Sequence, residues 1–151
     1  MTIVIDFIRF KHKKNMTKCR KLATDAIIIK NNRIVLIKRK YNPYKNYYAF
    51  PGGHLNINET FEEACVREVR EETSLKVRIR RLVNVYSSPK RYPGCNTISA
   101  CYECAALSGY LKGGDDAAEA HWVSLSKLPK KMAFDHAQMI KDYIKIAQNN
   151  N

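Results

Sequence analysis

Long apolar runs are missing from this 151-residue sequence. No stretch approaches the roughly 20 apolar residues that a membrane-spanning helix needs, so the sequence predicts no membrane association. Residues 1–10 have neither a basic segment before an apolar run nor a small-residue cleavage site, which makes them a poor match to a secretory signal peptide. We therefore expect a cytoplasmic protein.

Cysteines are few, and their number, five, is odd. A scattered, odd set argues against a disulfide framework and for a reducing compartment. Cys101 and Cys104 form a CxxC pair, but they lie in an alternating segment, in which residues three apart face opposite sides of a strand. The pair therefore does not predict a zinc or redox centre.

Acidic residues are also scarce, because 14 Asp and Glu stand against 27 Lys and Arg, for a formal net charge of +13. The excess is concentrated near the N-terminus, where a run of cations from Arg9 to Lys21 precedes the first predicted strand. Such a run is usually a solvated tail, although it can attract polyphosphate or RNA. We expect residues 1–20 to form a basic, flexible extension with RNA as a candidate partner; a natural start at Met16 is the alternative to Met1.

Repeats and a second domain are absent, and the length is typical of one domain. Residues 21–148 are predicted to form this domain and residues 149–151 a frayed tail. Strands are predicted at 22–30, 33–40, 48–50, 75–86, 97–107 and 121–124, with a hairpin turn at 31–32. Helices are predicted at 61–73 and from Phe134-Asp135 onward, with Asp135 as N-cap. This interleaving of strands and helices predicts an α/β fold.

Several of the few acidic residues gather in the helix predicted at 61–73. Thr60, with Glu63 three residues on, matches a capping box. At about 100° per residue, Glu68 and Glu72 fall within the apolar stripe of this helix and Glu71 lies at its edge. The stripe consists of Phe61, Ala64, Cys65 and Val69, and the predicted solvent side carries Glu63, Arg67, Arg70 and Thr73.

Carboxylates turned toward a core are costly unless they are paired or bound to a metal ion. A strongly negative, oxygen-rich cluster of this kind suits Mg²⁺ or Mn²⁺. The alternative is a solvated helix in which Glu63, Arg67 and Glu71 form ion pairs at i, i+4, since such pairs are common and individually weak.

The spacing of the whole segment carries a resemblance. From Gly53 the chain reads Gly, five residues, Glu59, seven residues, Arg67-Glu68-Val69, one residue, Glu71-Glu72, one residue, Ser74 and Leu75. This resembles the Nudix box, Gly-x5-Glu-x7-Arg-Glu-U-x-Glu-Glu-x-Gly-U with U aliphatic, except that Ser74 replaces Gly. The likeness extends from about Leu22 to about Ile144. It implies a Nudix-type α/β/α sandwich with a mixed β-sheet.

The resemblance also implies an activity, hydrolysis of a nucleoside diphosphate linked to another group X, with Mg²⁺ (or Mn²⁺) as cofactor. The metal ligands it implies are Gly53, through its carbonyl, and Glu68, Glu71 and Glu72. The catalytic residues it implies are Glu71, Glu72, Arg67 and Glu119. Arg67 is expected to orient a box glutamate through an ion pair. The general base is expected to be either a box glutamate or an acid from a later loop, for which Glu119 is the candidate.

Residues after the box resemble the ADP-ribose pyrophosphatase branch of the family. Pro89 follows Ser74 by fifteen residues, as in that branch, whereas the segment from Arg91 to Gly94 departs from the branch's Arg-Asp-Pro-Arg. The expected reaction is ADP-ribose to AMP and ribose 5-phosphate. Arg39 and Arg91 are the candidates for holding phosphate. The candidates for stacking with the base are Phe50, Tyr86 and Phe134, with Tyr47, Tyr48 and Tyr92 also available.

Two other readings remain open. The same machinery could act on (d)NTPs, dinucleoside polyphosphates or an mRNA cap, to which the basic N-terminus would be suited. A non-catalytic module that senses a nucleotide or binds RNA is the other reading, although such modules typically lose box carboxylates and this chain keeps Glu68, Glu71 and Glu72. A homodimer is expected by resemblance only.

Overall fold

The computed structural model describes residues 20–93, 96–114 and 117–149. Most of the predicted extension at 1–20 and residues 150–151 of the predicted tail therefore lie outside the described residues. The elements in chain order are β1 (Lys21–Lys30), β2 (Arg33–Arg39), β3 (Tyr48–Ala49), β4 (Gly52–His54), α1 (Phe61–Thr73), β5 (Lys76–Tyr86), β6 (Thr97–Ser108), β7 (Ala117–Ser124), the 3-10 helix η1 (Leu125–Lys127) and α2 (His136–Asn149). No helix in these ranges has the length and apolarity to cross a membrane.

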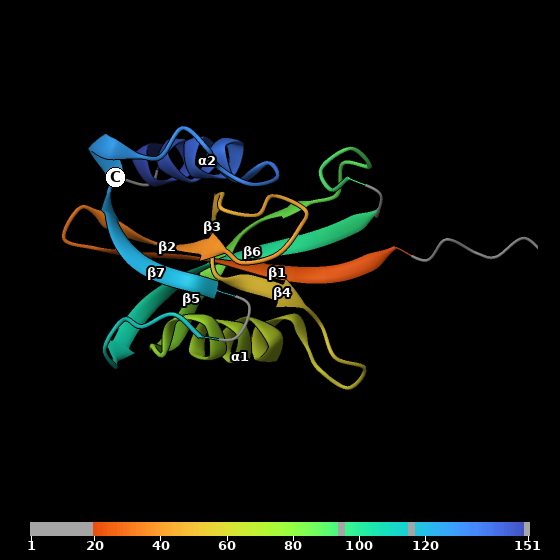
Figure 1. Ribbon diagram of the computed structural model, residues 1–151, viewed down its shortest axis with the longest axis horizontal. Helices are drawn as coiled ribbons and strands as arrows, with labels where there is room; N and C mark the ends of the chain where they lie inside the picture. Colours follow the sequence, from red (N-terminus) through yellow and green to blue (C-terminus); the bar gives the residue numbers. More distant parts are fainter. Residues whose placement is uncertain (1–19, 94–95, 115–116, 150–151) are drawn as a thin grey trace, which may run out of the picture.

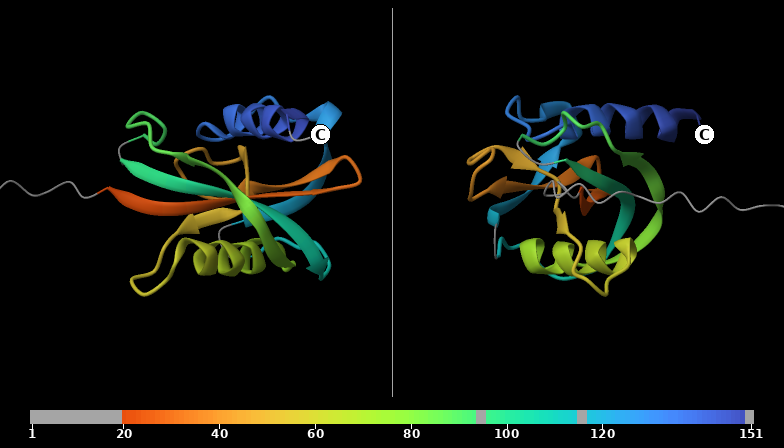
Figure 2. Two further views of the ribbon diagram at one scale, coloured as in Figure 1. Left: turned by 180° about the vertical axis from the view of Figure 1, so that it is seen from behind. Right: turned by 90° about the vertical axis from the view of Figure 1, so that its right-hand side faces the viewer.

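The strands form one mixed sheet between two helices, which confirms the predicted α/β/α sandwich. The main strand order is β3-β2-β1-β6-β5, with β4 paired to β1 and β7 paired to β2. β1 and β6 run parallel, and the other pairs are antiparallel. Figures 1 and 2 show α1 on one face of the sheet and α2 on the other.

Strand β1 passes through the centre of the molecule and supplies both faces of the core. Ala26 and Ile28 join the apolar cluster beneath α1, whereas Ile27 between them joins the cluster beneath α2. Because successive side chains of a strand point to opposite faces, a strand covered on both sides reads as a continuous apolar run, as this one does.

Local sequence determines the ends of two elements. Asn31 and Asn32 have φ angles of 50° and 55°, so the predicted hairpin turn between β1 and β2 is built from residues that tolerate this conformation. The capping box predicted at the start of α1 is present, with reciprocal hydrogen bonds between Thr60 and Glu63. The helix ends at Ser74, whose φ of 60° places it in the left-handed region where glycine is favoured.

The structure corrects several sequence-based expectations about individual residues. Thr73, predicted on the solvent side of α1, is fully buried, and its hydroxyl donates to the Val69 carbonyl. Asp135 stands directly before α2, where its carbonyl accepts from the Met139 amide, and its carboxylate is engaged by Arg91. Asn149, predicted to be frayed, is the last residue of α2.

The structure also corrects the bounds of two strands. Gly52–His54, which lies outside every predicted strand, forms β4 because it pairs with β1. β7 begins at Ala117, four residues earlier than predicted, because its pairing with β2 extends that far. In both cases the pairing partner is distant in sequence, so the local pattern carries no signal of it. As predicted, Cys101 and Cys104 are free thiols on opposite faces of β6.

Candidate active site

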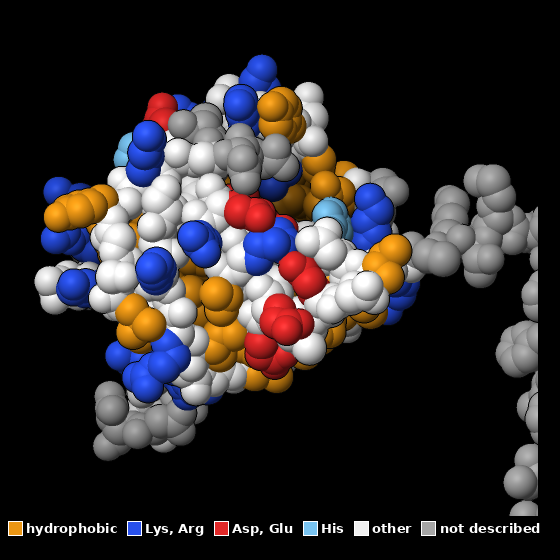
Figure 3. Space-filling model, turned by 90° about the horizontal axis from the view of Figure 1, so that it is seen from below, with side chains coloured by type: hydrophobic (Ala, Val, Ile, Leu, Met, Phe, Trp, Pro, Cys, Tyr) orange, Lys and Arg blue, Asp and Glu red, His pale blue; other side chains and the backbone are white. Residues whose placement is uncertain are grey.

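A cavity of about 370 Å³ lies where β1, the end of β2, β4 and α1 meet the segments around residues 91 and 134. Six of the residues predicted from sequence line it: Arg39, Gly53, Glu68, Glu72, Arg91 and Phe134. Figure 3 views the molecule from the α1 side and shows acidic side chains gathered on that face, within a surface otherwise rich in Lys and Arg. Three acidic residues, Asp25, Glu68 and Glu72, line the cavity itself.

The glycines of β4 bring the backbone against two glutamates of α1. The Gly52 amide donates to Glu72 Oε2 at 2.8 Å. A methyl group on Gly53 would overlap the Glu68 carboxylate, so only glycine allows this approach. Glu72 is buried, and burial raises the pKa of the Glu68 carboxyl despite the neighbouring Arg67.

Arg67 joins three carboxylates. Its guanidinium donates to Glu59 Oε1 at 2.5 Å, to Glu68 Oε1 at 2.7 Å and to Glu71 Oε2 at 3.0 Å. The hydrogen bond from Arg67 is the largest cause of a pKa of about 2 for Glu59. Glu59 also accepts from the Asn56 amide just before the helix. Arg67 is therefore placed to hold Glu68 in position, with Glu59 as its anchor.

The donor set fits a divalent cation that retains water. Among the described residues, no group of three or more His, Cys, Asp and Glu side chains converges on one point. Glu68 and Glu72 nevertheless line the same cavity as Gly53, while the Glu71 side chain is 41% exposed and turned to Arg67. Mg²⁺ is commonly bound through one or two carboxylates together with waters and substrate phosphates, so two carboxylates and a backbone carbonyl suit it.

A buried polar network forms the floor of the cavity. Asp25 accepts from Ser99 Oγ at 2.5 Å, and its other oxygen lies 3.4 Å from His136 Nε2. His136 Nδ1 accepts from the Phe50 amide, so Nε2 carries the proton. Burial acts to raise the pKa of Asp25, but His136 and Arg91 outweigh it and the pKa is lowered. Neither Asp25 nor Ser99 was predicted from the sequence, although a polar residue within an apolar strand is an available signal.

Two stacked aromatic rings also line the cavity. Phe134, at a φ of 53°, stacks on Tyr92 with ring centroids 4.9 Å apart. The Arg39 guanidinium lies 4.9 Å from the centroid of Phe134. All three residues line the cavity, and all three were among the candidates named from the sequence.

Two of the residues predicted to bind substrate lie elsewhere. Phe50 is 1% exposed and stacks on His136 beneath the cavity wall. The Tyr86 hydroxyl donates to Asp142 of α2 at 3.2 Å. Neither residue lines the cavity. Both residues lie in or beside strands. The face of the sheet to which their side chains point depends on strand pairing, which residue spacing alone does not reveal.

Arg91 and Glu119 have partners that bear on their predicted roles. Arg91 is buried and makes two hydrogen bonds to Asp135, of 3.0 and 2.9 Å, with Asp25 at 3.5 Å. Its charge is thus largely neutralised within the protein. Glu119 is exposed on β7, outside the cavity lining, and its hydrogen bond to His121 at 2.8 Å lowers its pKa.

Comparison of the sequence with known families and proteins gives a consistent result. The model of the NUDIX domain matches residues 20–143. An ADP-ribose pyrophosphatase of Methanocaldococcus jannaschii is 50% identical over 124 residues, which cover 82% of this chain and 73% of the relative. A putative 8-oxo-dGTP diphosphatase of Bacillus subtilis is 30% identical over 131 residues, covering 83% of this chain and 80% of that protein.

Solved structures show the same fold. A bifunctional NMN adenylyltransferase/ADP ribose pyrophosphatase of Francisella tularensis, complexed with AMP and a manganese ion, superposes with a TM-score of 0.79 at 29% identity. The match covers 87% of this chain but only 43% of the Francisella chain. This chain therefore spans less than half the length of that two-function protein.

Proposed function

Because this chain belongs to the Nudix family and is a Nudix pyrophosphohydrolase, we propose that it hydrolyses ADP-ribose to AMP and ribose 5-phosphate. The observation that carries the proposal is a single cavity whose lining combines the carboxylates of Glu68 and Glu72 with the stacked rings of Tyr92 and Phe134. A nucleoside diphosphate needs both features, carboxylates that hold a metal ion for its phosphates and a flat ring for its base. The 50% identity to a protein named ADP-ribose pyrophosphatase supports this substrate.

Nudix hydrolases need a divalent metal ion, and we propose Mg²⁺ or Mn²⁺ here. Gly53, Glu68 and Glu72 would hold it directly, and Glu71 would join them after turning from Arg67. A bound ion neutralises phosphate oxygens and lowers the pKa of a water for attack on phosphorus. Arg67 acts as a positioning residue, because its hydrogen bond fixes the Glu68 carboxylate beside Gly53.

The general base is one of two acids. Glu71 is the box glutamate with the most exposed carboxylate, and Glu119 is the acid outside the box. The hydrogen bond from His121 lowers the pKa of Glu119, which weakens its carboxylate as a base. Replacement of each by Gln distinguishes them, since loss of the base removes the acid limb of the pH–rate profile.

We assign binding of the nucleobase and of a phosphate to Phe134, Tyr92 and Arg39. A purine would stack against Phe134 or Tyr92, and the Arg39 guanidinium is close enough to reach a phosphate oxygen. Arg91 forms ion pairs with Asp25 and Asp135 and so stabilises the floor of the cavity. It does not serve as a free cation that binds phosphate.

A second substrate class, (d)NTPs, is favoured by one observation. The Bacillus subtilis relative is named a putative 8-oxo-dGTP diphosphatase and matches over a similar share of this chain. Dinucleoside polyphosphates and mRNA caps are further substrates of the same chemistry. RNA binding by residues 1–20 and a homodimer remain predictions. We place the enzyme in the cytoplasm because Cys65, Cys101 and Cys104 are free thiols.

The decisive experiment is phosphate release, coupled to a phosphatase, from ADP-ribose, NADH, dinucleoside polyphosphates, (d)NTPs and capped RNA with Mg²⁺ or Mn²⁺. A preference for ADP-ribose supports the proposal if the rate of its hydrolysis falls about 100-fold or more in Glu72→Gln. Glu62→Gln is the matched control, because Glu62 lies on the same helix, contacts Tyr102 and does not line the cavity. Preference for (d)NTPs or cap contradicts the substrate, and no metal-dependent turnover contradicts the activity.

A further inference from the structure

A second cavity, of about 260 Å³, lies at the opposite end of β1 and β2 from the catalytic cavity. The two cavities share no lining residue. β2 begins at Arg33, which lines the second cavity, and ends at Arg39, which lines the first. At a rise of about 3.3 Å per residue, the two are roughly 20 Å apart along this strand. Ligands in the two cavities would therefore not touch.

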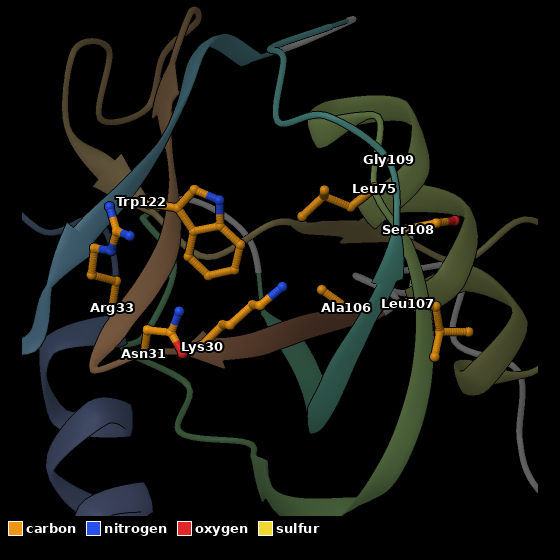
Figure 4. Close-up of a pocket in the computed structure, with 9 residues that line it drawn as sticks. All are labelled: Lys30, Asn31, Arg33, Leu75, Ala106, Leu107, Ser108, Gly109 and Trp122. Carbon is orange, nitrogen blue, oxygen red and sulfur yellow. The ribbon is translucent and has the colours of Figure 1, made fainter.

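The walls of the second cavity combine a flat ring with a cation. Figure 4 shows the indole of Trp122 facing the side chain of Leu75 across the space. The Lys30 side chain extends beneath the indole, with its ammonium directed toward Ala106. Arg33 stands on the other side of the indole from Leu75. A ligand in this space would meet an aromatic surface and a positive charge at once.

The two cations of this cavity have no carboxylate partner within residues 20–93, 96–114 and 117–149. Among the residues that the structure describes, no Asp or Glu lines the cavity. Within the part of the chain that the structure describes, the side chains of Lys30 and Arg33 make no hydrogen bond or ion pair. Arg67, Arg81 and Arg91, by contrast, are each paired with carboxylates. Unpaired cations beside an aromatic ring favour an anion that carries a ring of its own.

We propose that this cavity binds a nucleoside monophosphate, with its base against the indole of Trp122 and its phosphate held by Lys30 and Arg33. Bases of any kind stack on aromatic side chains, and Lys and Arg are the usual phosphate partners. The volume lies below the 300–1,000 Å³ typical of drug-sized ligands, which suits a single nucleotide and not a dinucleotide. The choice of nucleotide rests on the proposed function, because its product AMP carries both groups.

The test uses the fluorescence of Trp122, which is the single tryptophan of the chain. The full chain is titrated with AMP in the presence of EDTA, with excitation beyond the absorption of AMP. We expect a saturable change in emission, with an affinity at least about 10-fold weaker in Lys30→Ala, because one charge-assisted contact is lost. Lys141→Ala, an exposed lysine of α2, is the matched control and should titrate as the parent does. Adenosine and ribose 5-phosphate should each bind more weakly than AMP.

Three outcomes would overturn the proposal. These are no saturable change up to millimolar AMP, an equal affinity in Lys30→Ala, or loss of the response in Phe134→Ala, which would place the bound AMP in the catalytic cavity. ADP-ribose turnover is measured on the same samples. Turnover without a Trp122 response overturns this site alone, whereas a Lys30-dependent response without ADP-ribose turnover overturns the proposed substrate alone.

Discussion

At the scale of single residues, Gly52 and Gly53 are adjacent but would tolerate a side chain differently. A methyl group on Gly53 would meet the end of the Glu68 side chain, which can move. A methyl group on Gly52 would overlap the backbone of Thr24, which cannot move without breaking the pairing of β4 with β1. The added methyl group would therefore disturb the candidate metal site at Gly53 and the sheet at Gly52.

We therefore predict that Gly53→Ala stays folded and loses activity by about 10-fold or more, with a rise in the metal concentration needed. Gly52→Ala should lose stability instead. Thermal unfolding and metal titration of activity on both variants check this. A Gly53→Ala protein with the metal requirement of the parent would contradict the placement of Glu68 at the metal.

Asp25 is the residue on which pH should act most clearly. Its pKa in the folded protein is below the ordinary value of 3.8, so its stabilising effect is complete above that value and is lost as the pH falls through the folded pKa. Asp25→Asn should cost about 3 kcal/mol of unfolding free energy at pH 7, because Arg91 loses a buried partner.

The difference between parent and Asp25→Asn should shrink as the pH is lowered below 3.8, since Asp25 then binds a proton more readily in the unfolded chain than in the folded one. Urea unfolding at neutral and acid pH measures both values. A gap that stays constant across this range would show that the charge of Asp25 is not the source of the stability.

At the scale of elements, α1 begins with a favourable cap and ends with a costly one. Its first turn has the capping box of Thr60 and Glu63, whereas Ser74 adopts a left-handed conformation at a φ of 60°. A residue other than glycine costs about 1–2 kcal/mol in this conformation, of which roughly half is offset by the greater freedom of glycine in the unfolded chain.

We predict that Ser74→Gly raises the unfolding free energy by about 0.5–1 kcal/mol and the melting temperature by about 2 °C. Ser74→Ala, which keeps the Cβ atom, is the control and should show no such gain. Calorimetry on the three proteins measures the effect. A gain of equal size in Ser74→Ala would assign it to the loss of the hydroxyl and not to the backbone.

At the scale of the whole molecule, the described fold begins within one residue of the family match, which covers residues 20–143. The sheet and both helices are made by residues after Arg20. We propose, accordingly, that residues 21–148 are a single Nudix domain.

A chain of residues 20–151 should therefore fold and hydrolyse ADP-ribose with kcat and KM within about 2-fold of the full chain, because no residue of the cavity is removed. Any RNA affinity of the full chain should be salt-sensitive and should fall on truncation. Unfolding, kinetics and RNA binding at two salt concentrations test this. Failure of the shorter chain to fold would contradict the predicted domain boundary.

The sequence by itself determined features that depend on neighbours within a few residues of one another. The bounds of α1, its capping box, the hairpin at Asn31-Asn32 and the box spacing from Gly53 to Leu75 are of this kind. They were predictable because helical periodicity, turn preference and motif spacing are local properties.

Only the tertiary structure decided which distant residues share the cavity. Phe134 and Tyr92 lie beside Arg39, whereas Phe50 and Tyr86 face other parts of the core. The pairing of β4 with β1 and of β7 with β2, and the ion pairs of Arg91, likewise join segments far apart in the chain. The physical reason is that pairing and burial of remote segments depend on the packed whole, which no local pattern encodes.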